Sequence, residues 1–156
     1  MTWRRAKKGI VYIGEYSYFK GVGFLIGQSN KYKLLSFYDS PDKAIESLSN
    51  DNPDFIIMEV DFLFNDGLGS IRRIRELYNC LPILVLTSNF KKEIIAEAFC
   101  LGATGFISKS GSNVTGLIHS LEKLEREGFV VSGDVARGFI ELIRDSKLET
   151  TPIFNN

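Results

Sequence analysis

The stretch Pro53-Asp54-Phe55-Ile56-Ile57-Met58-Glu59 decides the fold class of this sequence. Four consecutive apolar residues stand between a turn-forming pair and a single acidic residue. A half-exposed strand alternates apolar and polar side chains, whereas a strand covered on both faces is apolar throughout. The stretch therefore predicts a buried strand over residues 55–58 that ends at an acidic side chain.

Further short apolar runs occur along the chain, at residues 10–13, 33–37, 83–86 and 105–107. The segments between and after them carry apolar residues at helical spacing, at residues 16–28, from 41 onward, 67–78, 91–101 and 113–126. Ser40 and Pro41 form a helix start, because serine is a favoured cap and proline suits the first helical position. Gly102 is a helix stop. Five strands alternating with five helices predict an α/β fold with a doubly wound five-stranded parallel sheet.

An extra helix is predicted over residues 133–145, after a short apolar run that follows Gly128. We therefore divide the chain into an N-terminal tail (1–8), a domain (9–127), a linker strand and helix (128–147) and a flexible tail (148–156). The basic residues at the N-terminus are interpreted as a solvated tail. The arginines of the third helix are interpreted as part of a solvated helix face.

Composition and charge argue against several classes of function. The 156 residues suit one compact domain, and the 19 basic and 19 acidic residues give a formal net charge of zero. This balance argues against a nucleic-acid surface spread over the whole chain, and the apolar runs are too short to span a membrane. Cys80 and Cys100 lack metal-ligand spacing and are interpreted as buried, reduced thiols of a cytoplasmic protein. With His119 as the single histidine, we expect no metal site of the zinc type.

Topology alone points to a candidate site. In doubly wound sheets the working site lies at the carboxyl ends of the strands, because those ends meet at one edge of the sheet. The residues at the ends of the predicted strands are polar or small: Gly14, Glu15, Glu59, Thr87, Ser88, Ser108 and Lys109.

The residues at these strand ends resemble those of the receiver domain of two-component response regulators, in particular of the NarL/FixJ (LuxR-type) family. The resemblance covers roughly residues 9–145. The motifs that carry it are Pro53 to Glu59, Gly67-Leu68, Leu86-Thr87-Ser88 and the segment Gly102-Ala103-Thr104-Gly105-Phe106-Ile107-Ser108-Lys109. The resemblance implies a flavodoxin-like fold, a phosphoacceptor pocket at the strand ends and a switch aromatic at Phe106. A buried aromatic on an edge strand is the alternative interpretation of Phe106.

The sequence departs from the family pattern inside that pocket. The resemblance implies an acceptor aspartate and two acids after the first strand, which together hold Mg²⁺, a cation that prefers carboxylate oxygens. Here Gly14 replaces the first acid, Glu15 remains, and the acceptor position is Glu59, one methylene longer than aspartate. We therefore expect a degenerate pocket with no catalytic residue and no metal or other cofactor.

The expected function is that of a pseudo-receiver that regulates without phosphorylation. Glu59 is expected to pair with Lys109 and to accept a hydrogen bond from Thr87, which would hold an active-like state without phosphate. Three alternatives stay open: Glu59 is merely a tolerated acid, the domain is still phosphorylated on Glu59 or another acid such as Asp61, or a small ligand fills the space at Gly14.

The predicted extra helix carries the apolar residues Val135, Phe139, Ile140 and Ile143, too many for a solitary surface helix. We predict a homodimer in which the two terminal helices, from residues 113 and 133, or the fourth and fifth helices take part, because two-fold dimers are the commonest oligomers. The alternative is a monomer whose helix packs on its own domain. DNA contact is expected only through a helix-turn-helix that these residues do not contain.

Overall fold

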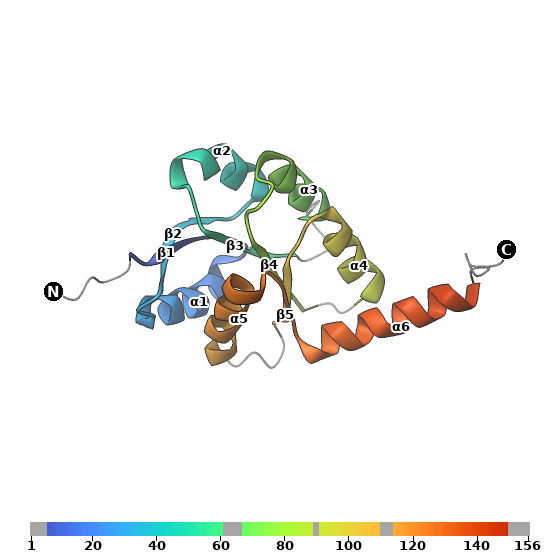
Figure 1. The fold of residues 1–156 in the computed structure, drawn as a ribbon. Helices are drawn as coiled ribbons and strands as arrows, with labels where there is room; N and C mark the ends of the chain where they lie inside the picture. The colour runs from blue at the N-terminus through green and yellow to red at the C-terminus, as the bar shows by residue number, and fades with distance from the viewer. Residues whose placement is uncertain (1–5, 61–66, 89–90, 110–113, 150–156) are drawn as a thin grey trace.

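The computed structural model describes residues 6–60, 67–88, 91–109 and 114–149 (Figure 1). The strands are β1 (Lys8–Ile13), β2 (Tyr32–Tyr38), β3 (Phe55–Glu59), β4 (Ile83–Thr87), β5 (Gly105–Ser108) and β6 (Val130–Val131). The helices are α1 (Tyr16–Gln28), α2 (Pro41–Asp51), α3 (Gly67–Leu77), α4 (Lys92–Leu101), α5 (Val114–Glu127) and α6 (Gly133–Glu149). This order confirms the predicted alternation of strands and helices.

The sheet is parallel throughout, with strand order β2-β1-β3-β4-β5-β6. The doubly wound architecture is confirmed, but the sheet has six strands where five were predicted. After Gly128, whose φ of 79° lets the chain reverse, Val130 N–H donates to the Thr104 carbonyl at 3.1 Å and opens β6. Because β6 pairs with β5, Phe106 does not lie on an edge strand, contrary to one of its two interpretations.

Two helical layers cover the sheet. Helices α1 and α5 lie on one face, and α2, α3 and α4 lie on the other (Figure 1). Along β3, Phe55 and Ile57 pack in the cluster under α1 and α5, whereas Ile56 and Met58 pack in the opposite cluster. All four are at most 2% exposed, which confirms the buried strand predicted from this run.

Helix ends follow the predicted signals. The Ser40 hydroxyl accepts a hydrogen bond from Lys43 N–H at 3.3 Å, and Pro41 opens α2. Gly102, with a φ of 120°, ends α4, and its N–H donates to the Phe99 carbonyl. Glycine is favoured there because side-chain-bearing residues rarely adopt positive φ.

Helix α6 packs against α4 of its own domain and then extends outward past it (Figure 1). Val135 is fully buried, and the Phe139 ring meets the Phe99 ring of α4 at 5.0 Å between centroids. Ile140 and Ile143 remain 50% and 53% exposed. Val135 is therefore used within the domain and Phe139 is partly buried against it, while the part that these four residues play in a dimer stays a prediction.

Two further expectations are corrected. Helix α6 continues to Glu149, beyond the boundary at residue 147, and the rest of the expected tail lies outside the described residues. Cys80 and Cys100 are both exposed rather than buried.

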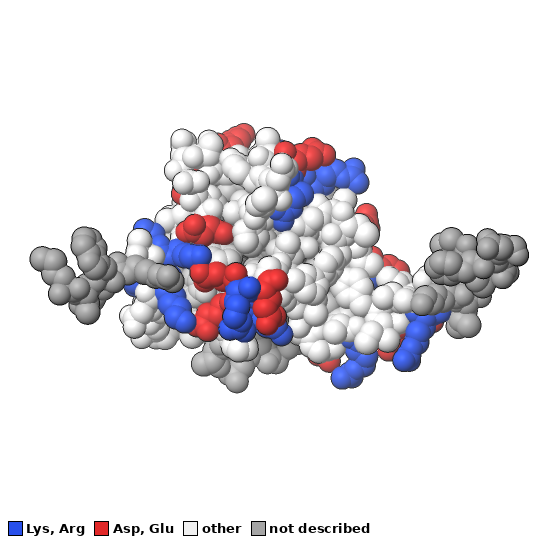
Figure 2. All heavy atoms as spheres, in the orientation of Figure 1, with Lys and Arg blue, Asp and Glu red and all other residues white. Residues whose placement is uncertain are grey.

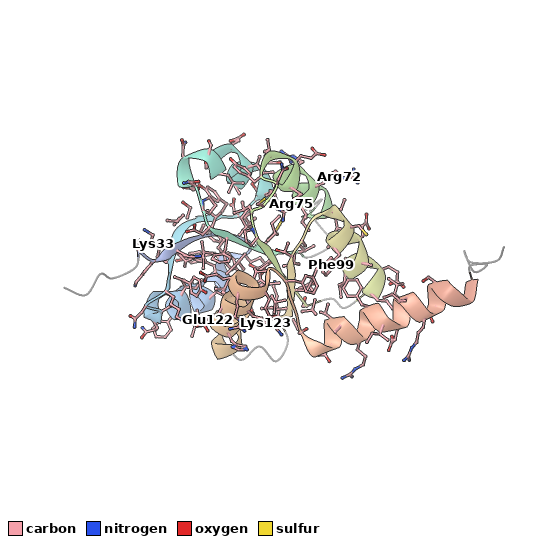
Figure 3. All side chains as sticks on the ribbon, in the orientation of Figure 1. Lys33, Arg72, Arg75, Phe99, Glu122 and Lys123 are labelled. Atoms are coloured by element: carbon pink, nitrogen blue, oxygen red, sulfur yellow. The ribbon has the colours of Figure 1, made fainter. Side chains whose placement is uncertain are left out.

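Arg75 does not belong to a solvated helix face. Its guanidinium donates to the carbonyl oxygens of Gly102, Tyr78 and Asn79 at 2.6–3.2 Å and so joins the ends of α3 and α4. Figure 3 labels Arg75 inside this layer and Arg72 at its outer side. Burial lowers the pKa of Arg75, because desolvation disfavours the charged guanidinium.

On the opposite layer, ion pairs tie α5 to β1 and to the residue before β2. Lys8 contacts Glu125, and Lys31 contacts Glu122 at 3.1 Å. Figure 2 shows acidic and basic atoms interleaved on this face, with neither sign forming a large patch of its own. Within the described ranges, no helix is both long and apolar enough to cross a membrane.

Candidate functional site

Glu59 ends β3 with its side chain turned into the protein. It is two residues after Ile57 and so lies on the same face of the strand. Ile57 packs in the cluster under α1 and α5, and the Glu59 carboxylate therefore points toward the start of α1. Only 3% of the Glu59 side chain is exposed. A charged group this well buried has to be paired and hydrogen-bonded, because desolvation otherwise costs several kcal/mol.

Both oxygens of the Glu59 carboxylate are engaged. Oε2 accepts hydrogen bonds from the Tyr12 hydroxyl at 2.8 Å and from Glu15 N–H at 2.6 Å. Oε1 contacts the ammonium group of Lys109, whose side chain is 12% exposed. The predicted Glu59–Lys109 pair is confirmed, and it lies within a buried network that joins β1, β3, the start of α1 and the end of β5.

Gly14 provides the space for this carboxylate. A Cβ atom built on Gly14 would lie 1.9 Å from Glu59 Oε2 and 2.5 Å from Glu59 Cδ, far inside any allowed contact. No side chain therefore fits at position 14 while Glu59 holds its present conformation. The space in which we considered a small ligand is occupied by Glu59 itself.

The Glu59 carboxylate lies between a neutral hydrogen-bond donor, the Tyr12 hydroxyl, and a cation, the Lys109 ammonium. Burial, and then the nearby charge of Glu59, raise the pKa of Tyr12, so its hydroxyl stays protonated and donates. The Lys109 ammonium also lies over the ring of Tyr18 at 5.1 Å from the centroid. The carboxylate in turn faces the N-terminal end of α1, where the helix dipole stabilises negative charge.

The pocket residues do not fit the Mg²⁺ ion that the family resemblance implies. Mg²⁺ requires near-octahedral oxygen ligands, several of them water. Gly14 offers no side-chain oxygen, and the Glu59 oxygens already contact Tyr12, Lys109 and a backbone N–H. Among the residues that the structure describes, no group of three His, Cys, Asp or Glu side chains is placed to hold a metal. Asp61, the alternative acceptor, lies outside the described residues.

The remaining predicted residues take different roles. Glu15 is exposed and contributes its main-chain N–H to the pocket. Thr87 is buried at the end of β4, where its carbonyl accepts from Lys109 N–H at 2.9 Å; its hydrogen bond to Glu59 stays a prediction. Phe106 is 1% exposed and faces the other layer of helices, where its ring stacks on Phe99 at 5.2 Å.

Sequence reasoning missed Tyr12 and Tyr18. Tyr12 stands in an apolar run, and it enters the site because it is two residues before Gly14 and so shares its face of the strand. Its phenol spans the distance to Glu59 and needs a partner for its hydroxyl once buried. Tyr18 carries no local signal, since it meets Lys109 only through the packing of α1 on the sheet.

Comparison with known proteins places this geometry in a family context. The profile described as "Response regulator receiver domain" matches residues 17–121. The transcriptional regulatory protein YdfI of Bacillus subtilis is 25% identical over 123 residues, which cover 79% of this chain and 57% of YdfI. The chain also spans 63% of the transcriptional regulatory protein DegU of Brevibacillus brevis. The chain thus covers less than two thirds of these two relatives.

Solved structures agree on the fold. A LuxR-family two-component response regulator from Aurantimonas superposes with a TM-score of 0.80 at 21% identity, over 89% of this chain and 99% of that one. RcsB of Salmonella enterica serovar Typhimurium, bound to promoter DNA, superposes with a TM-score of 0.78 at 19% identity, over 94% of this chain and 73% of that one. The chain belongs to the response regulator receiver domain family.

Proposed function

We propose that this chain is a phosphorylation-independent receiver, the N-terminal part of a NarL-type transcriptional regulator. It works through protein contacts and not through catalysis. One observation carries the proposal: the carboxylate at the acceptor position is already bound by Tyr12, Glu15 N–H and Lys109. An oxygen held in this way is unavailable both as a metal ligand and as a nucleophile.

The Glu59–Lys109 pair supplies an arrangement that other receivers obtain from phosphate. The family resemblance implies that the phosphate on an acceptor aspartate draws in the pocket lysine. Here the longer side chain of Glu59 carries negative charge toward Lys109 without modification. A pair buried to this degree is hard to break, because separating it leaves an uncompensated charge and costs about 3–5 kcal/mol. The pocket is thus held in one state.

A receiver with a fixed pocket still regulates if its surface binds another protein. RcsB, which shares this fold, has been solved as dimers bound to DNA. For this chain we propose homodimer formation, and we assign DNA contact to a helix-turn-helix outside the described residues. Its zero net charge supports a protein partner for the receiver more than a nucleic acid.

Calorimetric titration with Mg²⁺ tests the proposal. The protein is expected to give no saturable heat up to millimolar Mg²⁺, whereas a receiver with all three acids gives a binding isotherm under the same conditions. The Gly14→Asp/Glu59→Asp double variant is the matched comparison. It restores an acidic residue at position 14 and an aspartate at position 59, and the shorter side chain at position 59 leaves room for a side chain at position 14. Saturation of the unmodified protein at sub-millimolar Mg²⁺ contradicts the proposal.

A further inference from the structure

Helix α6 carries two arginines on the side that faces away from the domain. Successive side chains of an α-helix are turned by about 100°, so Arg137 and Arg144 lie about 180–200° away from Val135. Val135 is fully buried against the domain, whereas both arginines are exposed. Figure 2 shows basic atoms projecting along the lower side of this helix. Arg137 and Arg144 together form what we call the arginine stripe of α6.

The acidic residues beside the arginine stripe do not neutralise it. Glu141 and Asp145 contact the Lys92 ammonium of α4 at 3.6 and 3.2 Å. Asp134 lies in the first turn of α6, where the helix dipole stabilises negative charge. Within the described ranges, neither arginine of the stripe has an ion pair or a side-chain hydrogen bond. Two guanidinium groups therefore face solvent on a helix whose neighbouring acids have other partners.

The chemistry and the spacing of the stripe suit a row of phosphate groups. A guanidinium group binds phosphate through two parallel hydrogen bonds, a geometry that lysine cannot offer. Arg137 and Arg144 are seven residues apart, which in a helix is a rise of about 10.5 Å. Three base pairs of duplex DNA rise by about the same distance. Phosphates of one DNA strand therefore come within reach of both side chains when α6 lies along the backbone.

We infer that the arginine stripe of α6 binds the phosphate backbone of duplex DNA. This assignment rests on the proposed function, under which α6 leads to the helix-turn-helix and is the receiver element nearest to DNA. The chain spans 57% of YdfI and 63% of DegU, both named as transcriptional regulatory proteins. Base sequence is then read by the helix-turn-helix, and α6 adds a contact that does not depend on sequence. The zero net charge of the chain agrees with a contact this local.

Titration of the full chain with a short mixed-sequence DNA duplex, followed by amide chemical shifts in NMR, tests the inference. Shift changes are expected along α6 and not around the pocket. With only two phosphate contacts the binding is expected to be weak, with a Kd of about 0.1 mM or above at low salt. Each phosphate contact contributes about −0.9 to the slope of log affinity against log salt. The affinity is therefore expected to fall about tenfold between about 50 and 200 mM salt.

The Arg137→Gln/Arg144→Gln double variant is expected to lower the affinity at least tenfold and to bring the salt slope close to zero. Lys33→Gln/Arg72→Gln is the matched control, because it removes the same charge from two exposed residues on β2 and α3 (Figure 3). The control is expected to change the affinity less than about twofold. Equal losses in the two double variants would show a general attraction of charges and overturn the inference. An unmodified protein whose α6 signals do not shift at low salt would overturn it as well.

An acidic protein surface is the competing partner for the same stripe. Ile140 lies between the two arginines and is 50% exposed, so a protein interface would use it. Ile140→Ser is expected to leave the DNA affinity unchanged, and a poly-glutamate peptide of matched charge is expected to shift the α6 signals less than DNA does. An equal response to the peptide would overturn the assignment to DNA. All titrations omit Mg²⁺ and phosphoryl donors, so their failure leaves the proposed function of the Glu59 pocket standing, and failure of that proposal leaves these results unchanged.

Discussion

Substitution of Gly14 by alanine tests whether Gly14 and Glu59 are physically interdependent. The new Cβ would lie 1.9 Å from Glu59 Oε2, so the carboxylate has to retreat to an ordinary contact distance of at least 3.4 Å. That movement breaks the hydrogen bonds from Tyr12 and from Glu15 N–H to the same oxygen. Hydrogen bonds to a charged group contribute about 1.5–3 kcal/mol each. Alanine also reduces the conformational entropy of the unfolded chain, which stabilises the fold by about 0.4–1 kcal/mol. The free energy of unfolding is therefore expected to fall by roughly 2–5 kcal/mol.

Urea unfolding followed by circular dichroism measures this loss as a double-mutant cycle. The second background is Glu59→Ala/Lys109→Met. It removes the Glu59 carboxylate together with the Lys109 ammonium, so that no unpaired charge stays buried. In that background Gly14→Ala is expected to be neutral or slightly stabilising, because the space is free. Gly21→Ala is the control and is expected to stabilise by about 1 kcal/mol, since its Cβ meets nothing. An equal cost of Gly14→Ala in both backgrounds would refute the steric coupling.

Three further predictions concern the pocket and α6. Lys109→Ala is expected to destabilise the fold by about 3–5 kcal/mol, because it leaves the buried carboxylate unpaired; exposed Lys91→Ala is the control, and equal urea midpoints for the two would contradict the buried pair. Stability is expected to fall as pH rises above about 10, since the pKa of Tyr12 is raised by burial and the unfolded chain loses that proton first; Tyr12→Phe should give a shallower decline, measured by urea unfolding across this range. Phe139→Ala is expected to lower the free energy of unfolding by at most about 3–5 kcal/mol, the loss typical of a core position, and to raise the rate of amide hydrogen exchange along α6. Ile143 is half-exposed, so Ile143→Ala should change the exchange rate little.

The sequence predicted the fold well where the signal is local. Near-continuous apolar runs located the first five strands, and Ser40, Pro41 and Gly102 marked helix ends that the structure confirms. The family pattern then placed Glu59 and Lys109 at the ends of β3 and β5, which flank β4, and their pairing is confirmed. These features depend on residue type and spacing along the chain, which a sequence shows directly.

Features that depend on packing between distant segments could not be predicted. The sixth strand has only two residues and exists because β5 offers a free edge. The apolar residues of α6 have one helical periodicity, yet Val135 and Phe139 are covered by α4 while Ile143 is exposed. Arg75 reaches carbonyl groups at the end of another helix, and no spacing in the sequence announces that contact.

Intact-mass spectrometry after incubation with acetyl phosphate and Mg²⁺ tests the central claim most directly. The claim is that Glu59, held by Tyr12, Glu15 N–H and Lys109, makes phosphorylation unnecessary and chemically inaccessible. The account predicts no added phosphoryl mass under conditions that modify a receiver with an acceptor aspartate. A stoichiometric gain of one phosphoryl group, lost on mild alkaline treatment as an acyl phosphate is, would contradict it.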